Sequence, residues 1–113
     1  MEKRIHTIER KIGKIKEELL SIGDLRPGSL SQQYNVCGNP NCRCKEDLPR
    51  KHGPYYQLSF TRKGRSSTKF VKKHRLATVR EQLKNYSRLR KLVDTWIELS
   101  TELSQLKVDR ETD

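Results

Sequence analysis

A regular stripe of apolar residues near the start of the chain most restricts what the chain can fold into. The members of the stripe, separated alternately by three and four positions, are Ile5, Ile8, Ile12, Ile15, Leu19 and Ile22. This spacing places them on one face of a helix, at the a and d positions of a heptad repeat. Gly23 and Pro27 follow, and neither residue favours continuing a helix. The sequence therefore predicts a helix over residues 1–22 whose apolar face packs against a partner.

A second, longer amphipathic stretch over residues 76–106 can supply that partner. Its main apolar residues are Leu76, Val79, Leu83, Tyr86, Leu89, Leu92, Trp96, Leu99, Leu103 and Leu106. At about 1.5 Å per residue, the first helix spans roughly 30 Å and the second roughly 45–50 Å. If the helices pack antiparallel, the short helix cannot cover the long one. We expect an uncovered part of the stripe from Trp96 to Leu106 to bind a second copy and form a homodimer.

The segment between the two helices contains a loop and a hairpin. Residues 29–54 are rich in Ser, Asn, Gly, Pro and Cys, and predict an irregular loop. Residues 55–60 and 66–71 predict two short strands around a turn that contains Gly64. Residues 55–71 are therefore expected to form a two-stranded β-hairpin, and the polar residues 108–113 to form a frayed tail.

All three cysteines of the chain lie within eight positions of that loop. Cys37, Cys42 and Cys44, with His52, give the order C-x4-C-x-C-x7-H. Three thiolates and one imidazole form a complete tetrahedral shell for structural zinc. His74 is the alternative fourth ligand. Free cysteines are the other interpretation, but three within eight positions argue against it, and an iron–sulfur cluster would usually require a fourth thiolate.

The sequence predicts that this zinc is structural and that the protein is not an enzyme. Four protein ligands leave no open coordination position, and the residue order of the zinc deaminases is absent. No Ser/His/Asp arrangement, phosphate-binding glycine loop or paired-carboxylate motif occurs elsewhere. The N-terminus lacks the apolar region of a secretory signal, and no stretch is long and apolar enough to span a membrane. We therefore expect a cytoplasmic protein without membrane contacts.

Positive charge is concentrated in the middle of the chain. The formal net charge is +11, and residues 43–75 contribute +9 of it through eleven Lys or Arg residues against Glu46 and Asp47. Such a concentration is typical of a phosphate-binding surface, with a merely solvated charged face as the alternative. The predicted nucleic-acid-binding residues are Arg43, Lys45, Arg50, Lys51, Arg62, Lys63, Arg65, Lys69, Lys72, Lys73 and Arg75. The interleaved Tyr34, Tyr55 and Tyr56 either stack on unpaired bases or cover the metal site.

Three motifs, RPGSL, CG-x-P-x-C-x-C and HGPYY, lie within residues 26–92. Over these residues the chain resembles an uncharacterised family of short bacterial proteins, a domain of unknown function. The resemblance implies a zinc-binding element between helices and an association with bacterial mobile elements. It supplies no established activity.

These inferences combine into one prediction for the single domain of residues 1–113. The fold class is α+β, an antiparallel, coiled-coil-like helical hairpin with the zinc loop and the two-stranded β-hairpin at its tip. The predicted function is non-enzymatic nucleic-acid binding, with DNA preferred over RNA because of the mobile-element association, as an accessory factor of such an element. The alternative is a coiled-coil adaptor or assembly protein that binds a protein partner through the long helix.

Overall fold

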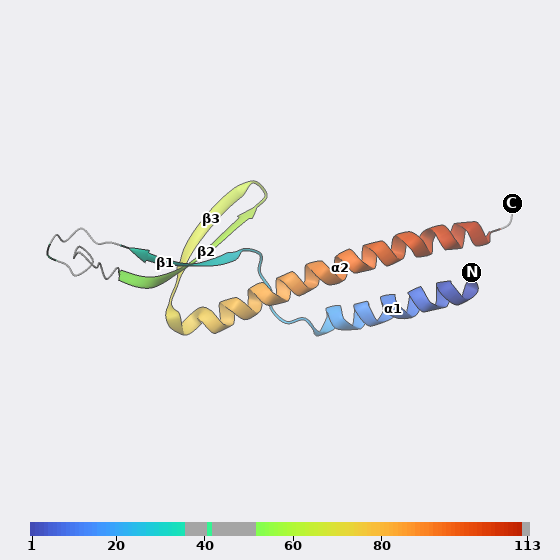
Figure 1. The fold of residues 1–113 in the computed structure, drawn as a ribbon, viewed down its shortest axis with the longest axis horizontal. Helices are drawn as coiled ribbons and strands as arrows, with labels where there is room; N and C mark the ends of the chain where they lie inside the picture. Colours follow the sequence, from blue (N-terminus) through green and yellow to red (C-terminus); the bar gives the residue numbers. More distant parts are fainter. Residues whose placement is uncertain (36–40, 42–51, 112–113) are drawn as a thin grey trace. The chain divides into compact units, whose positions relative to one another are not determined.

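The structure, a computed structural model, describes residues 1–35, 41 and 52–111. It has the predicted α+β class, with a helix towards each end of the sequence and three strands between these helices in chain order (Figure 1). The elements in chain order are α1 (Glu2–Ser21), β1 (Ser29–Asn35), β2 (His52–Arg62), β3 (Arg65–Val71), the short 3-10 helix η2 (Lys73–Arg75) and α2 (Leu76–Arg110). The placement of the zinc loop and hairpin at the tip of a helical hairpin stays a prediction.

The chain divides into two compact units, each with its own core. The helical unit consists of Met1–Arg26 and Lys84–Asp113, and the sheet unit consists of Pro27–Leu83. The first residues of α2 therefore belong to the sheet unit, and the rest of α2 belongs to the helical unit.

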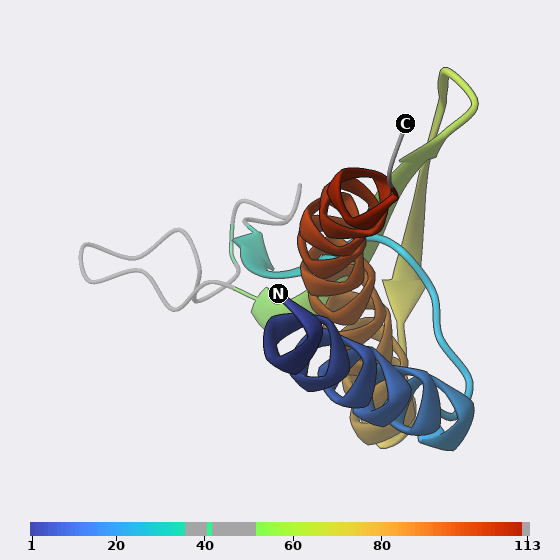
Figure 2. The same ribbon diagram turned by 90° about the vertical axis from the view of Figure 1, so that its right-hand side faces the viewer.

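The helical unit is an antiparallel pair in which α1 lies alongside the C-terminal part of α2 (Figures 1 and 2). The predicted apolar stripe of α1 faces its partner, because Ile5, Ile8, Ile12 and Ile15 are all buried. Glu2 pairs with Arg110 at one end of the pair, and Glu18 approaches Arg88 towards the other. The heptad spacing of the isoleucines thus predicted both the helix and the face that it buries.

One ion pair of this unit has bidentate geometry. The Arg4 guanidinium donates hydrogen bonds of 2.6 and 2.8 Å to the two carboxylate oxygens of Glu102. These hydrogen bonds, with the attraction between the charges, lower the pKa of Glu102 and raise the pKa of Arg4. Because the folded-state pKa of Glu102 is lowered, its stabilising contribution is present above the ordinary glutamate pKa and is lost as the pH falls. Both side chains are well exposed, so this contribution is small.

The expected exposure of the C-terminal apolar stripe on α2 is wrong. Trp96, Leu99, Leu103 and Leu106 are half-buried, because α1 lies along this part of α2. The Lys16 ammonium group lies 5.4 Å from the centre of the Trp96 ring, which confirms the contact between the helices. α2 also continues to Arg110, so residues 108–110 are helical and not part of the predicted frayed tail.

The sheet unit contains three antiparallel strands in the order β1-β2-β3. Its buried cluster consists of Leu58, Val71, Leu76 and Val79, and the partly buried residues packed against it are Leu30, Tyr56 and Leu83. The start of α2 therefore covers one face of the sheet. The opposite face of the sheet, which we call the outer face, carries the alternate residues of each strand.

The predicted irregular loop over residues 29–54 is wrong for its first seven residues, which form β1, and for residues 52–54, which begin β2. The sheet consequently has three strands instead of the predicted two. β1 has the sequence SLSQQYN, and it pairs with β2 from Ser29 opposite Ser59 to Asn35 opposite His52. Only Leu30 contributes an aliphatic side chain to the core side, so the strand lacks clear apolar alternation. Backbone pairing with the more apolar β2 holds this edge strand in place.

Two glycines of the quoted motifs allow β1 and β2 to approach each other. Gly28 of RPGSL has a φ of +130°, and a Cβ atom there would lie 2.8 Å from the backbone oxygen of Ser59. Gly53 of HGPYY has a φ of +133°, and a Cβ atom there would lie 2.8 Å from the backbone oxygen of Gln33. Any larger residue would be strained at either position and would also collide with the neighbouring strand.

Candidate nucleic-acid interface

The β2–β3 hairpin ends in a tight turn that carries a lysine. Arg62 and Arg65 are the last paired residues, so Lys63 and Gly64 form a two-residue loop. Both loop residues have positive φ, 52° and 76°, as a type I′ turn requires. The turn is shorter than the five-residue turn expected from the sequence, and its backbone twist matches that of the two strands.

Lys63 occupies a backbone conformation that disfavours its own side chain. The left-handed region costs a non-glycine residue about 1–2 kcal/mol, and Asn or Asp before Gly is the usual choice in such a turn. A lysine at this position places a positive charge between Arg62 and Arg65 at the end of the hairpin. The unfavourable backbone conformation is a reason to look for a function of that charge.

The described basic residues of the interface are all exposed. They are Arg62, Lys63, Arg65, Lys69, Lys72, Lys73 and Arg75. The cross-strand register places Arg62, Arg65 and Lys69 on the same face as Leu58, but outside the buried cluster. None of the seven forms an ion pair with another described residue. Their charge is therefore not neutralised within the described part of the unit.

The remaining predicted phosphate-binding residues, Arg43, Lys45, Arg50 and Lys51, lie outside the described residues. The predicted zinc ligands Cys37, Cys42 and Cys44 also lie outside them. Their sites stay predictions from the sequence.

The two candidate histidine ligands lie towards the same end of the sheet. His52 begins β2 opposite Asn35, and Cys37 follows Asn35 by two positions in the sequence. His74 lies in η2, shortly after the last residue of β3. Among residues 1–35, 41 and 52–111, no group of three or more His, Cys, Asp and Glu side chains could hold a metal ion. A zinc site would therefore need the cysteines, whose thiolates are suitable donors.

The aromatic residues of the sheet unit have different environments. Tyr56 is half-buried against the core, and the Arg80 guanidinium lies 5.9 Å from the centre of its ring. Tyr55 and Tyr34 are exposed, and the Tyr34 hydroxyl accepts a hydrogen bond from the Gln32 amide. The most exposed aromatic residue is Phe70, which the sequence did not identify as a binding residue. Because Phe70 precedes the buried Val71 on a strand, alternation could have placed it on the outer face.

A family model described as Domain of unknown function (DUF6788) matches residues 5–81, which include most of α1, the whole sheet and the start of α2. The chain belongs to this family. The DUF6788 match agrees with the resemblance to an uncharacterised family and assigns no activity. No curated protein and no solved structure in the comparisons matches the chain.

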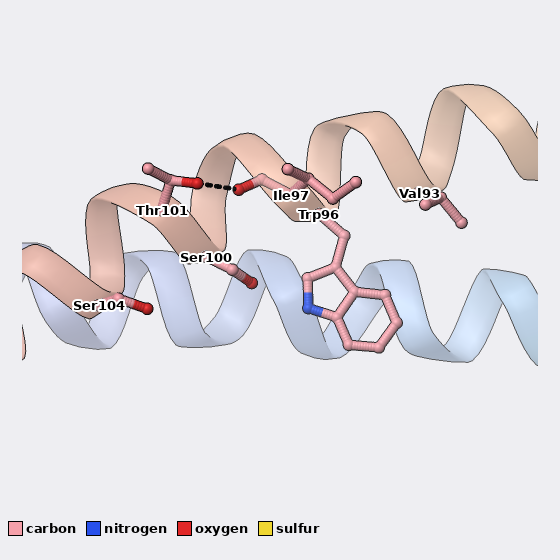
Figure 3. A pocket seen from close by; sticks show the side chains of 6 residues that line it. All are labelled: Val93, Trp96, Ile97, Ser100, Thr101 and Ser104. Carbon is pink, nitrogen blue, oxygen red and sulfur yellow. Dashed lines mark hydrogen bonds between the residues drawn. The ribbon is translucent and has the colours of Figure 1, made fainter.

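A second surface of interest lies on the helical unit. Val93 and Ile97 are exposed on α2, and they line two adjoining shallow pockets of about 260 and 600 Å³. Figure 3 shows the smaller pocket, where Trp96 extends over α1 and the Thr101 hydroxyl donates a 2.8 Å hydrogen bond to the Ile97 carbonyl oxygen. Within the described part of the chain, no helix has the length and apolarity needed to cross a bilayer.

Proposed function

We propose that this DUF6788 protein is a non-enzymatic nucleic-acid-binding protein that contacts phosphates through the end of the β2–β3 hairpin and the residues after β3. The observation that carries the proposal is the group of seven exposed basic residues without ion-pair partners among the described residues. The predicted basic residues of the cysteine-containing segment would extend this surface. A structural zinc ion would stabilise that segment, and DNA is preferred over RNA as the ligand.

The shape of the hairpin supports binding to the phosphate backbone. A two-stranded β-ribbon can enter or follow a nucleic-acid groove, and the type I′ turn presents Arg62, Lys63 and Arg65 around Gly64. Lysine and arginine contacts to phosphates release condensed counterions, which favours binding at low salt. Such contacts position a protein without reading sequence, so we expect weak sequence preference from this chain alone. An accessory role in a mobile element is consistent with that behaviour.

Replacing Arg62 and Arg65 together with alanine is expected to weaken binding to a DNA duplex and to reduce its salt dependence. Each lost phosphate contact lowers the slope of log binding constant against log salt concentration by roughly 0.9, so the double variant should lose about two. Duplexes of different sequence should be affected equally. Fluorescence anisotropy at several salt concentrations measures the slope directly.

The matched control for this experiment is the double replacement of Lys11 and Lys14 with alanine. Both lysines are exposed on α1, so this variant has the same net charge as the hairpin variant but an intact hairpin. Its salt slope should equal that of the wild type. Equal losses in the two variants would indicate a nonspecific charge effect, and a flat titration of wild-type protein with duplex and single-stranded DNA and RNA at low salt would refute the proposal.

The exposed apolar face of α2 around Val93 and Ile97 supports a second part of the proposal, a homodimer. On an α-helix, this face lies roughly 100° from the face that packs on α1, as expected for a helix with two neighbours in a four-helix bundle. We propose that a second copy covers it. This surface replaces the Trp96–Leu106 stripe, which α1 already covers.

Charge complementarity favours an antiparallel arrangement of the two copies. Arg90 and Lys91 precede Val93 on α2, whereas Asp94 and Glu98 follow it. If two α2 helices cross antiparallel at Val93 and Ile97, the basic side of one copy faces the acidic side of the other. A parallel arrangement would oppose like charges, which is unfavourable.

Replacing Ile97 with glutamate is expected to convert the dimer to a monomer, because it buries an unpaired charge in the proposed interface. The matched control, Thr95→Glu, adds the same charge on the opposite side of α2 and should stay dimeric. Ile97 is 58% exposed within one copy, so the fold of the variant should survive, which far-ultraviolet circular dichroism can verify. Sedimentation equilibrium measures the masses. A monomeric wild-type protein at high concentration would contradict the homodimer.

The same apolar face also supports the alternative function, a coiled-coil adaptor. A coiled-coil adaptor would bind a foreign protein through Val93 and Ile97, and its partner binding would be insensitive to charge changes at the hairpin. A monomeric wild type, a flat nucleic-acid titration and a partner lost on Ile97→Glu would together favour the adaptor.

A further inference from the structure

The outer face of the sheet has an uncharged polar surface with two aromatic residues at one end. The cross-strand register places on this face Ser31, Gln33, Tyr55, Gln57, Ser59, Thr61, Ser66, Thr68 and Phe70. The Gln33 amide donates a 2.7 Å hydrogen bond to the Gln57 side-chain oxygen, and Thr61 and Ser66 share a hydrogen bond of 2.9 Å. These contacts confirm that neighbouring strands present the same face.

Phe70 is 71% exposed and Tyr55 is 41% exposed on this face. Phe70 pairs in register with Gln57, and Tyr55 precedes Gln57 by two positions on the same face, so the two rings are diagonal neighbours. A single exposed aromatic residue is ordinary on a protein surface. Here two exposed aromatic residues lie on one face, next to lysines without ion-pair partners among the described residues. Binding sites for single-stranded nucleic acids combine these two features, aromatic rings that stack on bases and positive charges that contact the backbone.

A shallow pocket is lined by both of these aromatic residues and by two lysines. It has a volume of about 250 Å³, and the residues that line it include Tyr55, Phe70, Lys72 and Lys73. Lys72 follows β3 with extended backbone angles, φ −66° and ψ 143°, and it lines the same pocket as Phe70. The volume lies below the roughly 300–1,000 Å³ of pockets that enclose a small ligand, so the site suits an open stacking contact.

We propose that Phe70 and Tyr55 stack on unpaired bases of a single-stranded nucleic acid while Lys72 and Lys73 contact the adjoining phosphates. This inference rests on the proposed nucleic-acid-binding function and specifies the ligand. A stacking ring needs the open face of a base, which a duplex hides between neighbouring base pairs. Stacking tolerates any base, so the site agrees with weak sequence preference.

The test compares three probes of equal length, namely a labelled oligothymidine, an abasic oligonucleotide with the same phosphates, and a duplex. Replacing Phe70 with alanine is expected to weaken oligothymidine binding between about fivefold and 150-fold, the range that corresponds to the loss of one stacked base. Binding to the abasic probe should not change, and the salt slope should stay that of the wild type. An oligouridine of the same length distinguishes RNA from DNA as the source of the bases.

Three control variants separate stacking from other effects. Phe70→Trp should retain or increase affinity, whereas Phe70→Leu, which keeps an apolar side chain without a π-face, should behave like Phe70→Ala. Leu20→Ala removes an apolar side chain that is 88% exposed on α1 and does not line the pocket, and it should have no effect.

The possible outcomes distinguish this inference from the function on which it rests. If the wild type binds all three probes equally and Phe70→Ala changes none of them, the stacking site is refuted while phosphate binding stands. If the wild type binds none of the probes at low salt, the nucleic-acid-binding function itself is refuted. Weakened binding of every probe by Phe70→Ala would also overturn the stacking role, since it would indicate a structural effect.

Discussion

Replacing Leu58 with alanine is expected to lower the free energy of unfolding of the sheet unit by about 2–5 kcal/mol. Leu58 is 1% exposed, and in the described part of the chain it forms a buried cluster with Val71, Leu76 and Val79. Removing its side chain removes the apolar contacts with these neighbours and leaves a cavity. The paired strands and the start of α2 can relax only partly to fill that cavity. Urea unfolding followed by circular dichroism measures the change.

Leu20→Ala is the matched control for Leu58→Ala. It removes the same atoms from a leucine that is 88% exposed on α1, so its effect should stay within about 0.5 kcal/mol. A small effect of Leu58→Ala, equal to that of the control, would contradict the assignment of Leu58 to the centre of the core.

The sequence predicted the helices well because their signals are local. The three-and-four spacing from Ile5 to Ile15 requires no knowledge of the rest of the chain, and all four isoleucines are buried as expected. The surface left uncovered on α2 was mispredicted, because helix lengths do not determine which part of the longer helix the shorter one covers. The ion pairs of Glu2 with Arg110 and of Arg4 with Glu102 show that α1 covers the C-terminal part.

The sheet was harder to predict because its signals are non-local. Residues 29–35 contain few apolar side chains, and β1 becomes recognisable only through its pairing with β2. The outer face likewise depends on register: Phe70 and Val71 are adjacent, and only the pairing of Leu58 with Lys69 and of Tyr56 with Val71 establishes which of them faces the core. The basic surface could be predicted without knowing the strand register, because the concentration of Lys and Arg is visible in the sequence.

The small core of the sheet unit gives a physical reason to expect an additional stabilising element. In the described part of this unit, four buried apolar residues and three partly buried ones support three strands. Small domains with so little buried apolar surface usually need metal ions, disulfides or association. In the sequence, three cysteines lie between the end of β1 and the start of β2, and thiolates are suitable zinc ligands.

Purified, reduced protein is therefore expected to contain one structural zinc ion per chain, bound by Cys37, Cys42, Cys44 and His52. Structural zinc contributes roughly 10–16 kcal/mol of apparent binding free energy in zinc-finger peptides. Removing the zinc with a chelator, or replacing Cys42 with serine, should therefore disrupt the sheet unit. The helices α1 and the C-terminal part of α2 should lose less helicity. Elemental analysis of the variants identifies the fourth ligand, because His52→Ala should lose zinc whereas His74→Ala should retain it. The opposite result would assign His74 as the ligand, and the absence of metal from freshly purified protein would refute the zinc site.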